Sequence, residues 1–276
     1  ATQGHSVATL TRSKRGPDDI RWDPAKGEIE MAKLEGFDAV IHLAGANLTS
    51  GRWTDERKKL LWSSRVDSTA FLVTALSRLE KRPSIFLSGS GIGFYGSDAE
   101  ATFDESAKKG DGFLAEVCEA WEAAAYRAES LGCRVALLRT GVALDPQGGA
   151  LERMLPIFRS GAGGPLGSGE QWFPWIALED WIRGVNWLLF AESVSGPVNL
   201  VSPHPVRQKD FATALGKRLS RPSFAPAPKM ALRMVFGEMA EEALLSSIRA
   251  EPSALLDAKY PFLLPELDQA LAFCLE

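Results

Sequence analysis

The residues with the most evident chemistry follow a short apolar run at residues 85–87. Ser88, Ser90 and Tyr95 lie there among four glycines, in the stretch SGSGIGFYG. Glycine and serine at this density offer backbone amides and hydroxyls to a ligand, and a tyrosine hydroxyl can carry a proton in catalysis. The stretch predicts a loop that forms part of a site. The alternative is a flexible turn that binds nothing.

A second feature is the apolar run at residues 39–43, within the stretch FDAVIHLAGAN. A continuous apolar run of this length is typical of a strand buried on both faces of a parallel sheet. It ends in Ala44, Gly45 and Ala46, small residues that let a ligand come close to the backbone. Ligands of open α/β sheets bind at this carboxyl edge. The same pattern also fits a core strand followed by an ordinary glycine turn.

A third feature is the basic segment at residues 11–15, which follows a predicted strand at residues 6–10. Thr11 and Arg12 begin this segment. An arginine presents a planar fork of donors that suits phosphate oxygens. The segment could therefore hold a phosphate, although the residues taken alone favour an ordinary solvated loop.

The elements that must position these residues alternate between strands and helices. Thr54 is a predicted N-cap, because acidic residues and an apolar helical pattern follow it. Strands that alternate with long helices indicate βαβ units, and therefore an α/β fold with a parallel sheet and right-handed crossovers. We predict helices at residues 53–81, 111–131, 180–191, 230–256 and 265–275, and strands at residues 85–87, 135–138 and 197–201.

Composition narrows the function classes. The chain has 276 residues, of which 45% are hydrophobic and 24% charged, and its net charge is −4. A nucleic-acid surface needs a basic patch, and a membrane span needs about 20 apolar residues, so neither partner is expected. The three cysteines and three histidines fit no metal-ligand spacing. We expect a cytoplasmic protein with reduced thiols and no metal site.

Taken together, motifs along the whole chain resemble the extended and atypical short-chain dehydrogenases/reductases. The resemblance is narrowest to the subgroup named epimerase family proteins, or nucleoside-diphosphate-sugar epimerases. The matching motifs are LTRS at 10–13, HLAGAN at 42–47, GRWT at 51–54, SRVDST at 64–69, FLAEVCEAWE at 113–122, LLRTGVAL at 137–144, GGPLGSGEQWFPWI at 163–176, SGPVN at 195–199 and FGEMAEEALLSS at 236–247.

The resemblance implies a Rossmann-like, doubly wound parallel sheet and a smaller C-terminal substrate domain. It places the NADP-binding domain at residues 1–144, and the lid and small domain at residues 145–276. Strands around residues 174–201 are expected to return to the first domain. It also implies that the chain begins about one βα unit late, without the strand and glycine fingerprint that open typical members.

The resemblance also assigns cofactor residues. Arg12, with Thr11 beside it, matches a position that contacts the adenosine 2′-phosphate, which favours NADP over NAD. The acidic residue that would bind a free 2′-hydroxyl is absent there. Leu43, Ala44 and Gly45 match the strand end that lines the adenosine and pyrophosphate.

Three further positions complete this predicted cofactor set. Arg65 matches a cofactor-side position, although its place among apolar residues would also fit a side chain that extends to water. Gly141 and Val142 match residues that lie beside the nicotinamide.

The usual catalytic residues are missing from their expected positions. Typical members carry a serine or threonine four residues before the tyrosine of a YG pair, and that position is Gly91, next to Ser90. The usual Tyr-x-x-x-Lys maps to Leu114 and Cys118, which cannot supply a tyrosine activated by a lysine. Ser90 and Tyr95 are therefore the candidate catalytic residues.

Three functions follow as hypotheses. The first is an NADP-dependent oxidoreductase or epimerase with an unusual proton donor, acting on an unknown small molecule for which the family name suggests a sugar nucleotide. The second is a catalytically silent, dinucleotide-binding regulator, and the third is an inactive fragment. A homodimer could form through the helices at 53–81 and 111–131, unless their apolar faces are used against the sheet.

Overall fold

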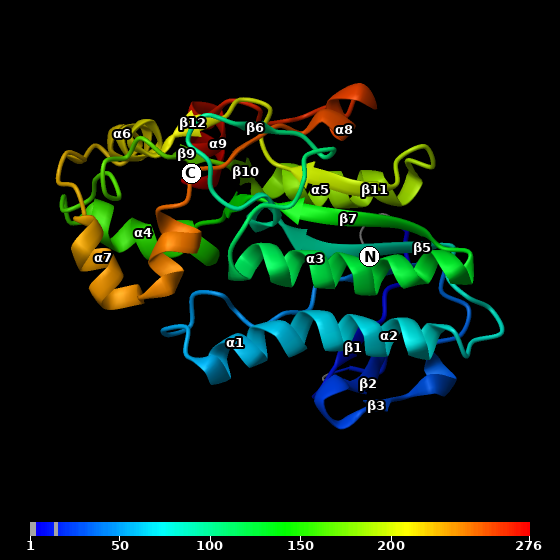
Figure 1. Ribbon diagram of the computed structural model, residues 1–276. Helices are drawn as coiled ribbons and strands as arrows, with labels where there is room; N and C mark the ends of the chain where they lie inside the picture. The colour runs from blue at the N-terminus through cyan, green and yellow to red at the C-terminus, as the bar shows by residue number, and fades with distance from the viewer. Residues whose placement is uncertain (1–3, 14–15) are drawn as a thin grey trace.

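The computed structural model describes residues 4–13 and 16–276. A four-stranded parallel sheet lies at the centre, in the order β11 (Gly196–Leu200), β7 (Arg134–Thr140), β5 (Ile85–Gly91) and β4 (Ala39–His42) (Figure 1). β5 and β7 pair over seven residues, from Ile85 opposite Arg134 to Gly91 opposite Thr140. The predicted parallel α/β sheet is confirmed.

Helices cover both faces of this sheet. Alternate residues of a strand point to opposite faces, so Phe86 packs with the buried residues of α2 (Ser68–Leu76) and α3 (Phe113–Tyr126). Leu87 packs on the other face with the buried residues of α5 (Leu178–Phe190). This two-sided burial explains why the strands read as continuous apolar runs.

The helix predicted at 53–81 is interrupted. Thr54 caps α1 (Asp55–Trp62), where its hydroxyl accepts a hydrogen bond from the Arg57 amide at 3.2 Å. A π-helical turn at Ser63–Asp67 then separates α1 from α2. The helix predicted at 111–131 forms as α3 and ends in a 3₁₀ turn at Arg127–Leu131.

Several predicted boundaries are wrong, and the strand predicted at residues 6–10 forms at Thr9–Thr11. β5 continues through Ser88 and Ser90 to Gly91, and a 3₁₀ turn at Ile92–Tyr95 follows, so the predicted loop begins later than expected. The predicted helix at 230–256 is broken after α7 (Lys229–Phe236), because Gly237 adopts a positive φ of 62°. A π-helical turn (Ala240–Leu244), β13 (Arg249–Ala250) and α8 (Ser253–Asp257) complete that segment.

A smaller sheet holds the first part of the chain, with β1 (Thr9–Thr11) parallel to β2 (Asp19–Asp23) and β3 (Glu28–Ile29) antiparallel to β2. No helix in the described ranges is long and apolar enough to cross a membrane. The cytoplasmic location, the homodimer and the domain boundary at residue 144 stay predictions.

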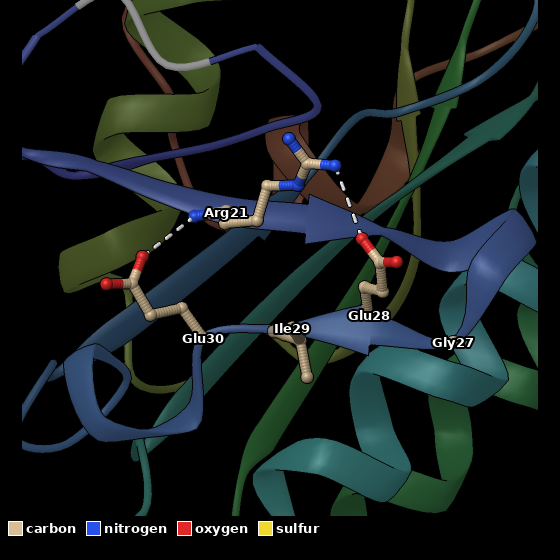
Figure 2. A pocket seen from close by; sticks show the side chains of 5 residues that line it. All are labelled: Arg21, Gly27, Glu28, Ile29 and Glu30. Carbon is tan, nitrogen blue, oxygen red and sulfur yellow. Dashed lines mark hydrogen bonds and ion pairs between the residues drawn. The ribbon is translucent and has the colours of Figure 1, made fainter.

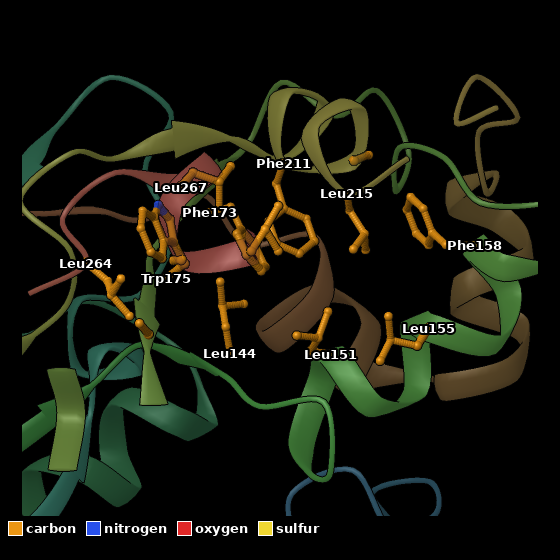
Figure 3. Packing of buried hydrophobic residues seen from close by; sticks show 14 residues of the cluster. Leu144, Leu151, Leu155, Phe158, Phe173, Trp175, Phe211, Leu215, Leu264 and Leu267 are labelled. Carbon is orange, nitrogen blue, oxygen red and sulfur yellow. The ribbon is translucent and has the colours of Figure 1, made fainter. Parts of the chain in front are cut away.

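A second lobe packs around its own apolar core (Figure 3). Leu151, Leu155 and Phe158 of α4 (Gly149–Arg159) meet Phe211 and Leu215 of α6 (Gln208–Arg218) there. The remaining elements of this lobe are short: β8 (Val142–Leu144), β9 (Trp172–Phe173), β10 (Trp175–Ala177), β12 (Val206–Arg207) and α9 (Leu267–Cys274). β13 pairs with β6 (Thr102–Phe103), which ties the segment after α7 to the first lobe, the part of the molecule built on the four-stranded sheet.

Candidate functional site

The carboxyl ends of the central strands lie at one edge of the sheet. β4 ends at His42, β5 at Gly91 and β7 at Thr140, and the three strands pair in parallel. Leu43, the first residue after β4, is 46% exposed, and Ala44 and Gly45 follow it. An exposed apolar side chain beside small residues is suited to contact a ligand at this edge.

Arg65 lies against this segment rather than extending to water. Its guanidinium donates to the Ala46 carbonyl at 3.0 Å and to the Leu61 carbonyl at 3.2 Å. It also lies over the Trp121 ring, 5.4 Å from the ring centre, and burial lowers its pKa. A Cβ atom at Gly45 would come within 3.0 Å of the guanidinium carbon, so the two predicted residues are in close contact.

A second arginine reaches the same loop. Arg57 donates to the Asn47 carbonyl, and its Nε atom is buried without a hydrogen-bond partner. The charge of Arg57 also lowers the pKa of Arg65. No carboxylate pairs with either guanidinium in the part of the chain that the structure describes. Two neighbouring cations without a counterion favour an anionic ligand.

The other predicted cofactor residues lie at the ends of two strands that belong to different sheets, β1 and β7. Thr11 ends β1, and the exposed Arg12 follows it, while Lys14 and Arg15 of the predicted basic segment lie outside the described residues. Gly141 connects β7 to β8, and its amide donates to the Leu200 carbonyl at 3.1 Å.

Gly141 also has a steric requirement. A Cβ atom there would lie 2.5 Å from the Pro174 oxygen, the same oxygen that accepts from the Val142 amide at 2.7 Å. Only glycine allows this close approach of the two backbone segments. The predicted residues Gly141 and Val142 are therefore fixed at the junction of the two lobes.

The two predicted catalytic hydroxyls are buried and already hydrogen-bonded. Ser90 donates to Glu122 Oε1 at 2.6 Å. Tyr95 is 2% exposed, donates to Asn199 Oδ1 at 2.7 Å and accepts from Arg139 at 3.0 Å. Burial raises the pKa of Tyr95 to about 12. Neither proton is free for a substrate in this arrangement.

These hydroxyls belong to a buried polar cluster around Arg139. The guanidinium makes a two-pronged contact with Glu122, at 2.8 Å for each nitrogen–oxygen pair. It also stacks on the Phe94 ring, 3.6 Å from the ring centre. Two parallel charge-assisted bonds fix the geometry of such a pair. The cluster therefore joins β5, α3, β7 and β11 near the carboxyl ends of the strands.

The positions of the usual catalytic set hold Gly91, Leu114 and Cys118. Gly91 lies beside Cys118, since a Cβ atom at Gly91 would be 3.7 Å from Cys118 Sγ, and Leu114 lies beside Gly93, where a Cβ atom would be 3.0 Å from Leu114 Cβ. Burial raises the pKa of the Cys118 thiol to about 11. None of these side chains exchanges a proton readily near neutral pH.

Sequence reasoning missed a second pair of arginines, which lies at the junction of the two lobes. Arg207 and Arg249 both lie over the ring of Trp172, at 3.9 Å and 4.8 Å from its centre. Arg207 donates to the Glu170 carbonyl at 2.6 Å. The Nε atom of Arg249 is buried without a partner. These residues are far apart in the sequence, so no spacing could reveal them.

An open hollow of about 720 Å³ lies beside β2 and β3 (Figure 2). Its charged residues already contact one another, because Arg21 pairs with Glu28 at 3.3 Å and the Arg21 amide donates to Glu30. The arginine pairs described above offer a ligand more unpaired charge than this hollow does.

Comparison with known proteins identifies the family. Residues 1–200 match the NAD dependent epimerase/dehydratase family. The chain belongs to this family. Residues 227–274 match a domain of unknown function, DUF1731.

Several relatives match over nearly the whole chain. Epimerase family protein MT2273 of Mycobacterium tuberculosis is 38% identical over 270 residues, which are 98% of this chain and 89% of that protein. Human epimerase family protein SDR39U1 is 35% identical over 272 residues, which are 98% of this chain and 91% of that protein. The crystal structure of human SDR39U1 (isoform 2) with NADPH has a TM-score of 0.89 and 33% identity, and the match covers 99% of this chain and 92% of that one.

Proposed function

We propose that this protein binds NADP(H) at the carboxyl edge of its sheet and that it is silent in the tyrosine-dependent chemistry of typical family members. The human relative whose structure contains NADPH supports the choice of ligand. The residues at the edge fit a dinucleotide, because Gly45 lets the Arg65 guanidinium lie against the backbone and because Arg57 and Arg65 lack counterions among the described residues.

The proposed contacts divide between the two ends of the dinucleotide. Arg12 and Thr11 would bind the 2′-phosphate, which selects NADP over NAD. Leu43, Ala44 and Gly45 would line the adenosine and pyrophosphate, and Arg65 would neutralise phosphate charge. Gly141 and Val142 would lie beside the nicotinamide, which supplies or accepts a hydride when bound.

One observation carries the proposed silence. The protons of Ser90 and Tyr95 are donated to Glu122 and Asn199, within a buried cluster. A general acid must reach the substrate and must have a pKa near the working pH. Tyr95 meets neither condition, because it is buried and its pKa is about 12.

A second candidate function is an oxidoreductase or epimerase that acts on an anionic substrate. The arginines that flank Trp172 favour it, since Arg249 has a buried donor without an acceptor. A phosphate or carboxylate would satisfy that donor, and a sugar nucleotide has the required phosphates. Ser90 and Tyr95 would then have to leave their present partners in order to transfer a proton.

An NADPH titration followed by tryptophan fluorescence tests the proposal, with NADH alongside and Arg12→Ala as the variant. We expect micromolar NADPH binding, much weaker NADH binding, and a loss of the preference in Arg12→Ala. Stoichiometric enzyme mixed with NADPH and a panel of sugar nucleotides should leave the cofactor unoxidised. Cofactor oxidation that disappears in Tyr95→Phe would instead establish the second candidate. Absence of binding to either dinucleotide would reject both functions.

A further inference from the structure

The segment at residues 229–245, here called the C-terminal arm, contacts the first lobe through polar groups at three places. Arg52 donates to the Met234 carbonyl at 3.2 Å, and Lys58 of α1 pairs with Glu238 at 2.5 Å. The carboxylate of Glu242 accepts from the first two amides of α3, each at 2.8 Å. The arm therefore crosses from the second lobe to the helices beside the candidate site.

Glu242 supplies the side-chain cap that the N-terminus of α3 lacks. The N-cap residue of α3 is Gly112, which has no side chain to accept from the exposed amides. A carboxylate is favourable at a helix N-terminus, both as an acceptor and through the helix dipole. One of the amides that Glu242 holds belongs to Leu114, the position at which typical members carry the catalytic tyrosine. The arm thus fixes the backbone at that position.

An apolar cluster continues the contact toward the site. Met239 of the arm is 1% exposed and packs with Trp53 and Leu61. Ala46 and Leu48, from the loop after β4, pack against the same cluster. Ala46 is the residue whose carbonyl accepts from Arg65.

Trp53 joins the loop to the arm. Its indole nitrogen donates to the Leu48 carbonyl at 2.9 Å, and its ring meets the Phe113 ring edge-on at 5.5 Å. Any displacement of Met239 would remove packing from Trp53 and, through it, from the loop that follows Gly45. The path from the arm to the proposed cofactor residues is continuous.

We infer that the C-terminal arm holds the loop at residues 43–48 ready for NADPH and thereby sets the affinity for that cofactor. The inference rests on the proposed function. A loop that is already ordered loses less conformational entropy when it binds, so its support raises affinity without touching the ligand. Coupling of this kind is reciprocal, and bound NADPH must stabilise the arm by the same factor.

Two kinds of variant separate this coupling from a general effect on the fold. Glu242→Ala removes the cap on α3, and Lys58→Met breaks the ion pair with Glu238 from the other side. Glu241→Ala is the matched control, because Glu241 pairs with Arg233, which lies within the arm. All three chains are titrated with NADPH, and amide hydrogen exchange over the arm is measured with and without NADPH.

We expect Glu242→Ala to weaken NADPH binding by about fivefold or more, Lys58→Met by a smaller factor, and Glu241→Ala by less than about twofold. NADPH should slow amide exchange over the arm in the unaltered chain and much less in Glu242→Ala. The inference would be overturned if all three variants bound NADPH with the affinity of the unaltered chain and if NADPH did not change amide exchange over the arm. The proposed function would then remain intact. An unaltered chain that does not bind NADPH would overturn both.

Discussion

The arginines of this protein occupy two contrasting regions. Near the carboxyl end of β7, Arg139 has its charge paired with Glu122, its face covered by Phe94, and further contact with Tyr95. At the lobe junction, Arg249 stacks on Trp172 and has no acceptor for its buried Nε atom. The same residue type is therefore satisfied in one region and unsatisfied in the other.

This difference separates a supporting region, whose residues stabilise the fold, from a region whose residues are free to bind a ligand. A buried charge that loses its partner is costly, so a complete set of partners marks a cluster that holds the fold together. A half-buried guanidinium without an acceptor lacks that role, and a ligand can supply what is missing. On this criterion, Ser90 and Tyr95 belong to the supporting region, although their residue types had suggested catalysis.

The largest effect is expected when the partner of Arg139 is removed, because this tests whether the Arg139 cluster stabilises the fold. Glu122→Ala leaves a buried cation uncompensated and should lower the free energy of unfolding by about 3–5 kcal/mol. Chemical denaturation measures this loss. The control is Glu119→Ala on the same helix, where an exposed pair with Lys109 should contribute less than about 1 kcal/mol. Equal losses in both variants would contradict the supporting role.

A second test uses pH at the end of β4. Burial lowers the pKa of His42 to about 4, from an ordinary value of 6.5. Its contribution to stability is complete above pH 6.5 and is lost as pH falls toward 4, so stability should fall by about 2 kcal/mol between about pH 7 and pH 5. Denaturation curves of His42→Phe should lack this component. An unchanged pH dependence in the variant would reject the assignment.

Tyr95→Phe tests the stabilising role of the same cluster with a smaller expected effect. It removes one buried hydroxyl from Asn199 and Arg139, and we expect a loss of about 1–2 kcal/mol in the free energy of unfolding. NADPH affinity should not change. Tyr126→Phe serves as the control, because no hydrogen bond of that hydroxyl appears among the described residues, and its effect should be smaller.

The smallest effect on stability is expected at the unsatisfied arginine. Arg249→Met removes a donor that has no acceptor, and the free energy of unfolding should stay within about 0.5 kcal/mol of the original or rise. Arg139→Met, measured by the same denaturation experiment, should lose several times more. A large loss in Arg249→Met would place that side chain in the supporting region too.

The sequence predicted the elements whose apolar pattern is local. β4, α3 and the parallel pairing of the sheet follow from short apolar runs and helical spacing. β5 was predicted to end too early because Ser90 looked like a loop residue. Its hydrogen-bond partner is Glu122, 32 residues away, and no local sequence pattern predicts that hydrogen bond.

The candidate site was less predictable, for the same reason. The family resemblance supplied Gly45 and Arg65, which lie in contact. Arg57 was missed because a lone arginine on a helix gives no signal until its helix has been placed beside the loop. Arg207 lies on β12 and Arg249 on β13, and the sequence predicted a helix over the region that contains Arg249.

The cap on α3 also affects how the chain is made. Glu242 lies 129 residues after Phe113, and its carboxylate accepts a hydrogen bond from the Phe113 amide. At about 5–20 residues per second, a ribosome needs on the order of ten seconds to add that length. The start of α3 has no side-chain cap from its own N-cap residue during this interval. The helix beside the candidate site therefore reaches its final stability only after the arm has left the ribosome and folded back.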